Sequence, residues 1–406
     1  MSIAAARTVV RPADAAAPPR QVPVLWLALL ATPIAAGANA PVLILPDMGR
    51  SLGVSTATVT WLVTAFAWAM SIGTPLLSGL IRQRGVAAAL KVGSAFVVAG
   101  TALVSFAPWL PLTLLGRAGQ AIGGAGLVAV ALNLAGSAKR MGVITSGFGI
   151  LGASGPLLGQ QLSSSVSWRL SLAVSALSLL AVPVVARHAK SAPPAPSTFD
   201  VRGAGLLVAL ATSLVLIPKA PLPALGAALV AAAFLGVHLK KRPEGFVPAA
   251  LLRSRAFLTA SAVALTLSTS YFALLFAVPQ LIKDRTDWSV GAVGTGQLVA
   301  MLAGSVLSWL LAAASARMGR RSVYGMLLGV GITAAVVAVF ASWAPLLLLA
   351  TTAAIFSATG SNACLAMYAG QASPAPQRPS AIGLFVLAYQ LGGALGPAIA
   401  ALLVLS

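Results

Sequence analysis

Acidic, histidine and cysteine residues are scarce in this chain, and their scarcity excludes several classes of protein. Of 406 residues, 6 are Asp or Glu, 2 are His and 1 is Cys. Metal centres and acid–base catalysis require clusters of these side chains, so we expect no enzyme, no metal site and no cofactor. Because Cys364 is the only cysteine, an intrachain disulfide is also excluded.

Charged residues make up only 8% of the chain, whereas hydrophobic residues make up 59%. A soluble domain has about a quarter of its residues charged. The net charge of +20 is carried by short basic clusters between apolar runs, not by one continuous basic region. This pattern is typical of loops at a membrane surface. We therefore expect a protein embedded in a lipid bilayer that binds no nucleic acid.

The apolar runs have the length of transmembrane helices. A helix crosses the hydrocarbon region in about 20 residues, and the runs are too long for the strands of a barrel. We predict an all-α polytopic membrane protein with about 13 transmembrane helices. The predicted spans are 23–45, 59–81, 88–107, 110–134, 142–163, 168–186, 203–218, 222–239, 256–280, 290–314, 322–341, 344–368 and 380–404.

The distribution of Lys and Arg predicts the orientation. With the N-terminus in the cytoplasm, twenty Lys and Arg residues fall in cytoplasmic segments and five in external ones, and Arg117 lies inside a span. Basic residues favour cytoplasmic loops, so this arrangement is the expected one. We predict a multi-pass protein of the cell membrane with a cytoplasmic N-terminus and, because the number of spans is odd, an external C-terminus.

Two short motifs occur twice and in the same order. "RQRG" at 82–85 is followed by "GASGP" at 152–156, and "RMGRR" at 317–321 is followed by "GALGP" at 393–397. Internal repetition is typical of transporters built from two halves. The predicted parts are a disordered cytoplasmic tail (1–22), a six-helix bundle (23–186), a cytoplasmic linker (187–202), an inserted two-helix hairpin (203–239), a second linker (240–255) and a five-helix bundle (256–404).

Several motifs resemble those of a known family. "SGLIRQRG", "GRAGQAIGGAG" and "GASGPLLGQ" are similar to motifs of the major facilitator superfamily, in particular its fourteen-helix drug:proton antiporter branch. The resemblance covers about residues 23 to 404. It implies a monomer with two helical bundles and an inserted hairpin, and it indicates that the family's closing helix is missing here.

The chain also departs from the family pattern. Arg82 stands where the family's basic loop has Asp, and Gln160 replaces a second glycine. Gly37 and Asn39 occupy the positions of an Asp and a Thr that are typical of the branch. Two of these departures, Arg82 and Gly37, remove carboxylates from positions at which the family has them.

Arg117 is the only charge between Lys91 and Lys139. An uncompensated arginine at mid-membrane costs about 2.5–3.5 kcal/mol on insertion scales. One alternative is that the side chain reaches to the external surface. We favour a place in a watery cavity, because Gln120 follows one helical turn later. The resemblance implies that Arg117 acts in proton coupling or substrate relay.

The remaining candidates divide into two groups. Pathway candidates fall on helices that line the cavity in the family: Asn39, Tyr271, Gln280, Tyr389 and Gln390. Gating candidates belong to the repeated motifs and the glycine-rich helix: Arg82, Arg84, Gly85, Gly123, Gly155, Pro156, Gly159, Gly396 and Pro397. A helix-internal proline removes a backbone hydrogen bond and permits a bend, although a packing contact between helices also explains such Gly-Pro elements.

We expect a secondary transporter that exports small hydrophobic molecules by alternating access and uses protons as the coupling ion. No Asp or Glu lies inside any predicted span, and Asp47, just beyond the first, is the nearest carboxylate. Since a fixed arginine repels cations in a medium of low dielectric constant, the substrates should be neutral or anionic. Two alternatives stay open: an importer of a nutrient or metabolite, and a transport-inactive membrane partner or sensor.

Overall fold

The computed structural model describes residues 21–135, 138–188, 200–372 and 378–403, and the regular elements in these ranges are all helices. Residues 1–20 of the predicted tail and 189–199 of the predicted first linker lie outside the described part. The helices of the N-terminal half are α1 (Val24–Asn39), η1 (Ala40–Leu43), α2 (Leu45–Leu52), α3 (Thr56–Val59), α4 (Trp61–Phe106), α5 (Leu110–Ala135), α6 (Ala138–Ser165), α7 (Trp168–Ala173), η2 (Val174–Ala181) and α8 (Val182–His188).

The second part of the chain begins with a hairpin and continues into another set of long helices. The hairpin consists of α9 (Val201–Leu216) and α10 (Pro221–Lys241), which pack on each other. The elements that follow are α11 (Ala249–Arg253), α12 (Arg255–Arg285), α13 (Val290–Ala314), η3 (Ser315–Arg317), α14 (Arg320–Phe340), α15 (Ala344–Gln371) and α16 (Arg378–Leu403).

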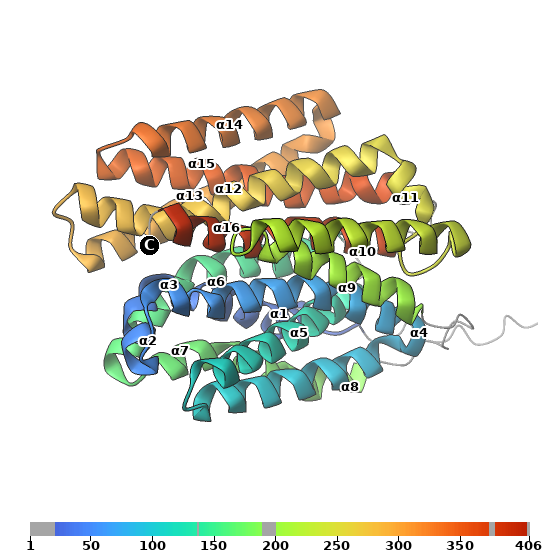
Figure 1. The fold of residues 1–406 in the computed structure, drawn as a ribbon, viewed down its shortest axis with the longest axis horizontal. Helices are drawn as coiled ribbons and strands as arrows, with labels where there is room; N and C mark the ends of the chain where they lie inside the picture. The colour runs from blue at the N-terminus through green and yellow to red at the C-terminus, as the bar shows by residue number, and fades with distance from the viewer. Residues whose placement is uncertain (1–20, 136–137, 189–199, 373–377, 404–406) are drawn as a thin grey trace, which may run out of the picture.

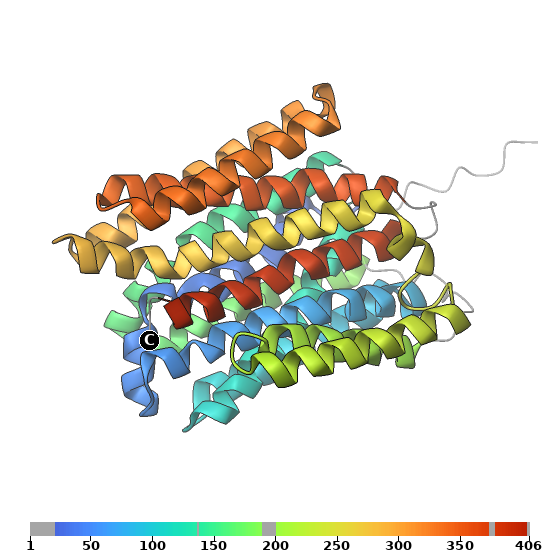
Figure 2. The ribbon, with the colours of Figure 1, turned by 45° about the horizontal axis from the view of Figure 1, so that its top comes forward.

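The long helices run roughly parallel and form two groups (Figure 1). Helices α1 to α8 make up one group, α12 to α16 make up the other, and α9 and α10 lie beside both. After a 45° turn, the hairpin lies at the edge of the bundle, next to α4 (Figure 2). The predicted two-bundle, all-α architecture is confirmed.

Eleven helices in the described ranges are long and apolar enough to cross a membrane. The two remaining predicted spans are α6, which is not among the eleven, and α9, which is an apolar helix of 16 residues. The predicted count of thirteen therefore stays a prediction.

Two predicted boundaries need correction. The first span was expected to be one helix over 23–45, but α1 ends at Asn39, and η1 and α2 follow it. Pro41 and Pro46 stand at the starts of η1 and α2, where the missing N–H of proline does no harm although it would interrupt a continuous helix. The second and third predicted spans are joined in α4, which has one non-helical residue, Gly85, with φ 81° and ψ 171°.

Gly85 makes the turn between the two segments of α4, because L residues with a side chain rarely adopt its positive φ. Arg84 beside it is exposed. The side chain of Arg82 lies outside the described part. Both segments pack against α5, since Gly73 of the first lies near Ile122 and Gly93 of the second lies near Gly123.

Glycines bring α4 and α5 into backbone contact. A Cβ on Gly123 would lie 2.5 Å from the carbonyl oxygen of Gly93, and a Cβ on Gly100 would lie 2.6 Å from that of Gly116. In a bilayer, helix association depends on such close approach rather than on burial of apolar surface. Gly123 is thus a packing residue in this conformation, and its predicted part in gating stays a prediction.

Substitution of Gly100 tests whether this contact stabilises the bundle. We expect Gly100→Ala to lower the free energy of unfolding by about 1–3 kcal/mol, because the added methyl group meets backbone atoms that cannot rotate away. Thermal unfolding of the purified protein in detergent measures the effect. Gly226→Ala on α10 is the matched control, since a Cβ there has no neighbour within 4 Å. Equal stability of both variants would contradict the prediction.

Candidate functional site

Arg117 on α5 carries its charge into the interior of the N-terminal half, where 0% of the residue is exposed. Its Nη1 donates to Gln120 Oε1 at 3.0 Å, and its Nη2 donates to the carbonyl oxygen of Gly37 at 3.2 Å. The guanidinium carbon lies 4.2 Å from the centre of the Phe66 ring, within the range of a cation–π interaction. Contacts with α1, α4 and its own helix therefore position this side chain.

Gln120 joins the arginine to the neighbouring helices. Residues three apart on an α-helix share a face, so Gln120 can accept from Arg117 through its oxygen. Its Nε2 donates to Thr101 Oγ1 and to the carbonyl oxygen of Leu172, both at 3.1 Å. The amide thus orients the guanidinium and connects α5 with α4 and α7.

The polar and aromatic partners of the guanidinium are all neutral. In the described part of the chain Arg117 Nε has no hydrogen-bond partner, and the two acceptors are an amide and a backbone carbonyl. A buried charge without a counter-charge is costly, and Nε is the one nitrogen of this guanidinium that makes no hydrogen bond to the described residues. The alternative that Arg117 reaches the surface does not hold in this conformation. Since the residue is fully buried, it also lines no open cavity here, and its place in a pathway stays a prediction.

Three of the other pathway candidates lie near the contact between the two halves. Tyr271 on α12 and Tyr389 on α16 belong to one apolar cluster. Gln390, the next residue on α16, accepts a hydrogen bond from Thr74 Oγ1 of α4 at 3.1 Å. We call this contact of α4 with α16 the α4–α16 seam, because it joins a helix of each half.

The structure separates the last two pathway candidates from this group. Asn39, at the end of α1, donates to the carbonyl oxygen of Gly152 on α6 at 3.0 Å, so it acts inside the N-terminal half. Gln280 donates to Asp284 at 2.8 Å in an exposed pair near the end of α12. Gln280 is therefore not brought together with the other candidates in this conformation.

The first Gly-Pro motif packs against the backbone of α1 and η1. A Cβ on Gly155 would lie 2.7 Å from the carbonyl oxygen of Ala36, and one on Gly159 would clash with that of Ala40. Pro156 lies inside α6, which continues through it. Close helix contact is therefore what this motif provides here, and its predicted gating role is not tested by one conformation.

The second Gly-Pro motif makes the corresponding contact in the other half. A Cβ on Gly396 of α16 would lie 2.6 Å from Phe272 Cβ and 2.7 Å from the amide nitrogen of Ala273 on α12. Pro397 follows inside the helix. The repeated sequence motif thus corresponds to a repeated packing contact, α6 on α1 and α16 on α12.

Two glutamines that were not among the candidates lie where α6 meets α13. Gln297 on α13 is 0% exposed; its Nε2 donates to the carbonyl oxygen of Leu275 at 3.1 Å, while its Oε1 has no partner in the described part. Gln160 Oε1 on α6 is also without a partner there, and it faces Gly294, one turn before Gln297. The only sequence signal was a glutamine in each apolar run, which does not show that the two helices meet.

Asp47 does not supply the missing counter-charge. It forms an ion pair with Arg50 three residues later, and 46% of its side chain is exposed. The carboxylate belongs to the surface of α2.

A family model described as Major Facilitator Superfamily matches residues 25–397. This chain belongs to the major facilitator superfamily. Membership agrees with the two bundles and the repeated Gly-Pro contacts. Two solved structures share the fold. A peptide transporter, POT, in complex with alafosfalin has a TM-score of 0.64 at 14% identity, over 93% of this chain and 87% of that one. The human organic anion transporter MFSD10 (TETRAN) has a TM-score of 0.63 at 17% identity, over 95% of this chain and 94% of that one.

Curated relatives of this superfamily member include a resistance protein. The lincomycin resistance protein of Streptomyces lincolnensis is 28% identical over 309 residues, 70% of this chain and 63% of the relative. "MFS transporter L2" of Phoma sp. is 29% identical over 132 residues, 31% of this chain and 22% of the relative. The chain thus aligns with less than two thirds of either relative's length.

A double-mutant cycle tests the link between Arg117 and Gln120. We expect Gln120→Leu to lower the free energy of unfolding by about 1–3 kcal/mol, because it leaves a buried charged donor unpaired. Arg117→Met combined with Gln120→Leu should cost less than the sum of the single changes, by about 1 kcal/mol or more. Denaturant unfolding in detergent supplies the four stabilities. Additive losses would show that the two side chains do not act as a unit.

Proposed function

We propose that this transporter exports neutral or anionic hydrophobic small molecules, such as drugs or secondary metabolites, by alternating access, with protons as the coupling ion. The proposal includes a monomer in the cell membrane, with the N-terminus in the cytoplasm. The right-hand end of the bundle in Figure 1, where α4 turns back, is then the cytoplasmic end. The gating candidates Gly155, Pro156, Gly396 and Pro397 would act at the contacts that the helices must adjust during the cycle.

The observation that carries the substrate class is the environment of Arg117. Its charge is buried and meets only neutral partners. Two like charges 4 Å apart repel each other by about 4 kcal/mol at an effective dielectric constant of 20. Electrostatic repulsion therefore opposes a cationic substrate that approaches this site. A neutral substrate is little affected, and an anionic one is attracted.

The proposed direction and driving force of transport are inferred from similarity to other proteins. Export is supported by the relative that confers lincomycin resistance, which aligns with 70% of this chain. Proton coupling is supported by the resemblance to the drug:proton antiporter branch. In the described part of the chain, no carboxylate is hydrogen-bonded to Arg117 in this conformation.

Accumulation of matched probes tests the proposal. Cells that express the protein are loaded with neutral, anionic and cationic hydrophobic dyes of similar size, with and without a protonophore. We expect lower accumulation of the neutral and anionic dyes, and loss of this difference when the protonophore is present. Saturable export of a permanently cationic dye would contradict the substrate class, and concentrative uptake of a solute would contradict export.

Neutralisation of Arg117 separates charge selectivity from general loss of function. We expect Arg117→Gln to reduce export of the anionic dye about tenfold, equivalent to about 1.4 kcal/mol, with a smaller effect on the neutral dye. Initial rates of dye efflux from proteoliposomes provide the measurement. Arg253→Gln makes the same chemical change on an exposed arginine of α11 and should leave both rates unchanged. Equal losses for the two dyes would show that Arg117 does not select for charge.

A further inference from the structure

One carboxylate joins three segments at the end of the bundle where α9 begins. Asp200 precedes α9 and is only 8% exposed. Its Oδ1 accepts from the Gly203 amide at 3.0 Å, its Oδ2 accepts from the Phe246 amide at 3.1 Å, and both oxygens lie 2.9 Å from His238 Nε2. The start of α9, the last turn of α10 and the loop before α11 are thus fastened to one side chain.

Two neighbouring glycines leave room for this carboxylate, because a side chain on either would meet it. A Cβ on Gly203 would clash with Asp200 Oδ2, and a Cβ on Gly245 would lie 2.5 Å from the same atom. Burial raises the pKa of Asp200, but the hydrogen bonds from Gly203, His238 and Phe246 outweigh burial and hold the pKa below its usual value. The carboxylate is therefore ionised at neutral pH.

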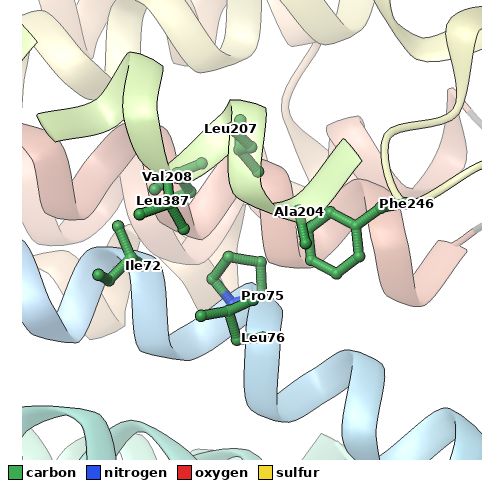
Figure 3. A pocket seen from close by; sticks show the side chains of 8 residues that line it. All are labelled: Ile72, Pro75, Leu76, Ala204, Leu207, Val208, Phe246 and Leu387. Carbon is green, nitrogen blue, oxygen red and sulfur yellow. The ribbon is translucent and has the colours of Figure 1, made fainter. Parts of the chain in front are cut away.

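The loop that Asp200 fixes carries a buried aromatic side chain to a crevice that both halves line. Phe246 is 7% exposed and lines an apolar crevice with residues of three helices (Figure 3). These residues are Ile72, Pro75 and Leu76 on α4, Ala204, Leu207 and Val208 on α9, and Leu387 on α16. Since α4 and α16 belong to different halves, Phe246 and α9 together cover the α4–α16 seam.

A second bond fixes α9 to the N-terminal half. Trp68 Nε1 on α4 donates to Thr212 Oγ1 on α9 at 2.9 Å. The packing of α9 on α16 supplies the contact with the other half. By contrast, α10 makes its main contact with α9, and one face of it carries exposed apolar residues such as Leu229 and Phe234. The hairpin is therefore attached across the seam through α9 and through the loop that holds Phe246.

We propose that Asp200 is a positioning residue that holds α9 and Phe246 as a clamp across the α4–α16 seam, and that the transporter opens at this end only when the clamp releases. The inference extends the proposed alternating access and depends on it. Rocking of one half against the other changes the contacts between α4 and α16, so an aromatic side chain that lines one crevice with residues of both helices stabilises the closed arrangement. The inserted hairpin then sets how often this end opens.

The distance between the two halves at this end reports the state of the clamp. Spin labels are placed at Arg84→Cys and Arg321→Cys, both exposed and one in each half, in a Cys364→Ser background of the full chain. Pulsed electron paramagnetic resonance on the purified protein gives the distance distribution. We expect Asp200→Asn to raise the ratio of the long-distance to the short-distance population about fivefold. No substrate is needed for this measurement.

Other variants separate a clamp from a general defect. Gly245→Ala displaces the carboxylate without changing charge, and Phe246→Ala removes the buried aromatic side chain, so both should shift the distribution in the same direction as Asp200→Asn. His238→Gln retains a donor for Asp200 and should shift it less than His238→Ala. Glu244→Gln is the matched control, because Glu244 is an exposed carboxylate in the same loop, and it should leave the distribution unchanged.

The outcomes distinguish the clamp from the transport function. An unchanged distribution in folded Asp200→Asn and Phe246→Ala, or an equal shift in Glu244→Gln, would overturn the clamp even if the parent exports dyes. If Asp200→Asn does not fold, the Gly245→Ala and Phe246→Ala variants decide the question in the same way. A shift in these variants without dye export by the parent would support the clamp and contradict the proposed function instead.

Discussion

Helices in a bilayer gain little by burying apolar side chains against one another, because lipid tails are equally apolar. The bundle therefore depends on places where backbones approach closely enough for dispersion contacts along the helices. Gly100 and Gly123 provide this between α4 and α5, Gly155 and Gly159 between α6 and α1, and Gly396 between α16 and α12. The recurrence of one contact in both halves gives the two bundles a corresponding internal packing.

Close packing also explains how an unpaired arginine is tolerated. The glycine-rich face of α5 brings α1 and α4 near enough for a backbone carbonyl and an aromatic ring to reach the guanidinium. Gly37 contributes its backbone carbonyl at a position where the drug:proton antiporter branch, which this chain resembles, has a carboxylate. The charge of Arg117 is consequently stabilised by dipoles rather than by a counter-ion, and this leaves a net positive site in the N-terminal half.

The two halves meet at places with different chemistry. At the α4–α16 seam, Thr74 and Gln390 bond to each other, and α9 with Phe246 covers the apolar part nearer one end. Where α6 meets α13, Gln160 and Gln297 have carbonyl oxygens without partners in the described part. Unpaired buried acceptors are costly, so they mark a contact that is not optimised for this one conformation.

The sequence by itself determined the membrane class, the positions of most helices, the turn at Gly85 and the superfamily, because hydropathy, charge and glycine act locally. It did not show the break after Asn39, the separation of Gln280 from the other candidates, or the hydrogen bonds that join three segments to Asp200. The bonds of Asp200 depend on which backbone atoms of a distant segment come within about 3 Å of the carboxylate. That choice is made by helix packing, in which small differences in glycine placement decide which residues meet.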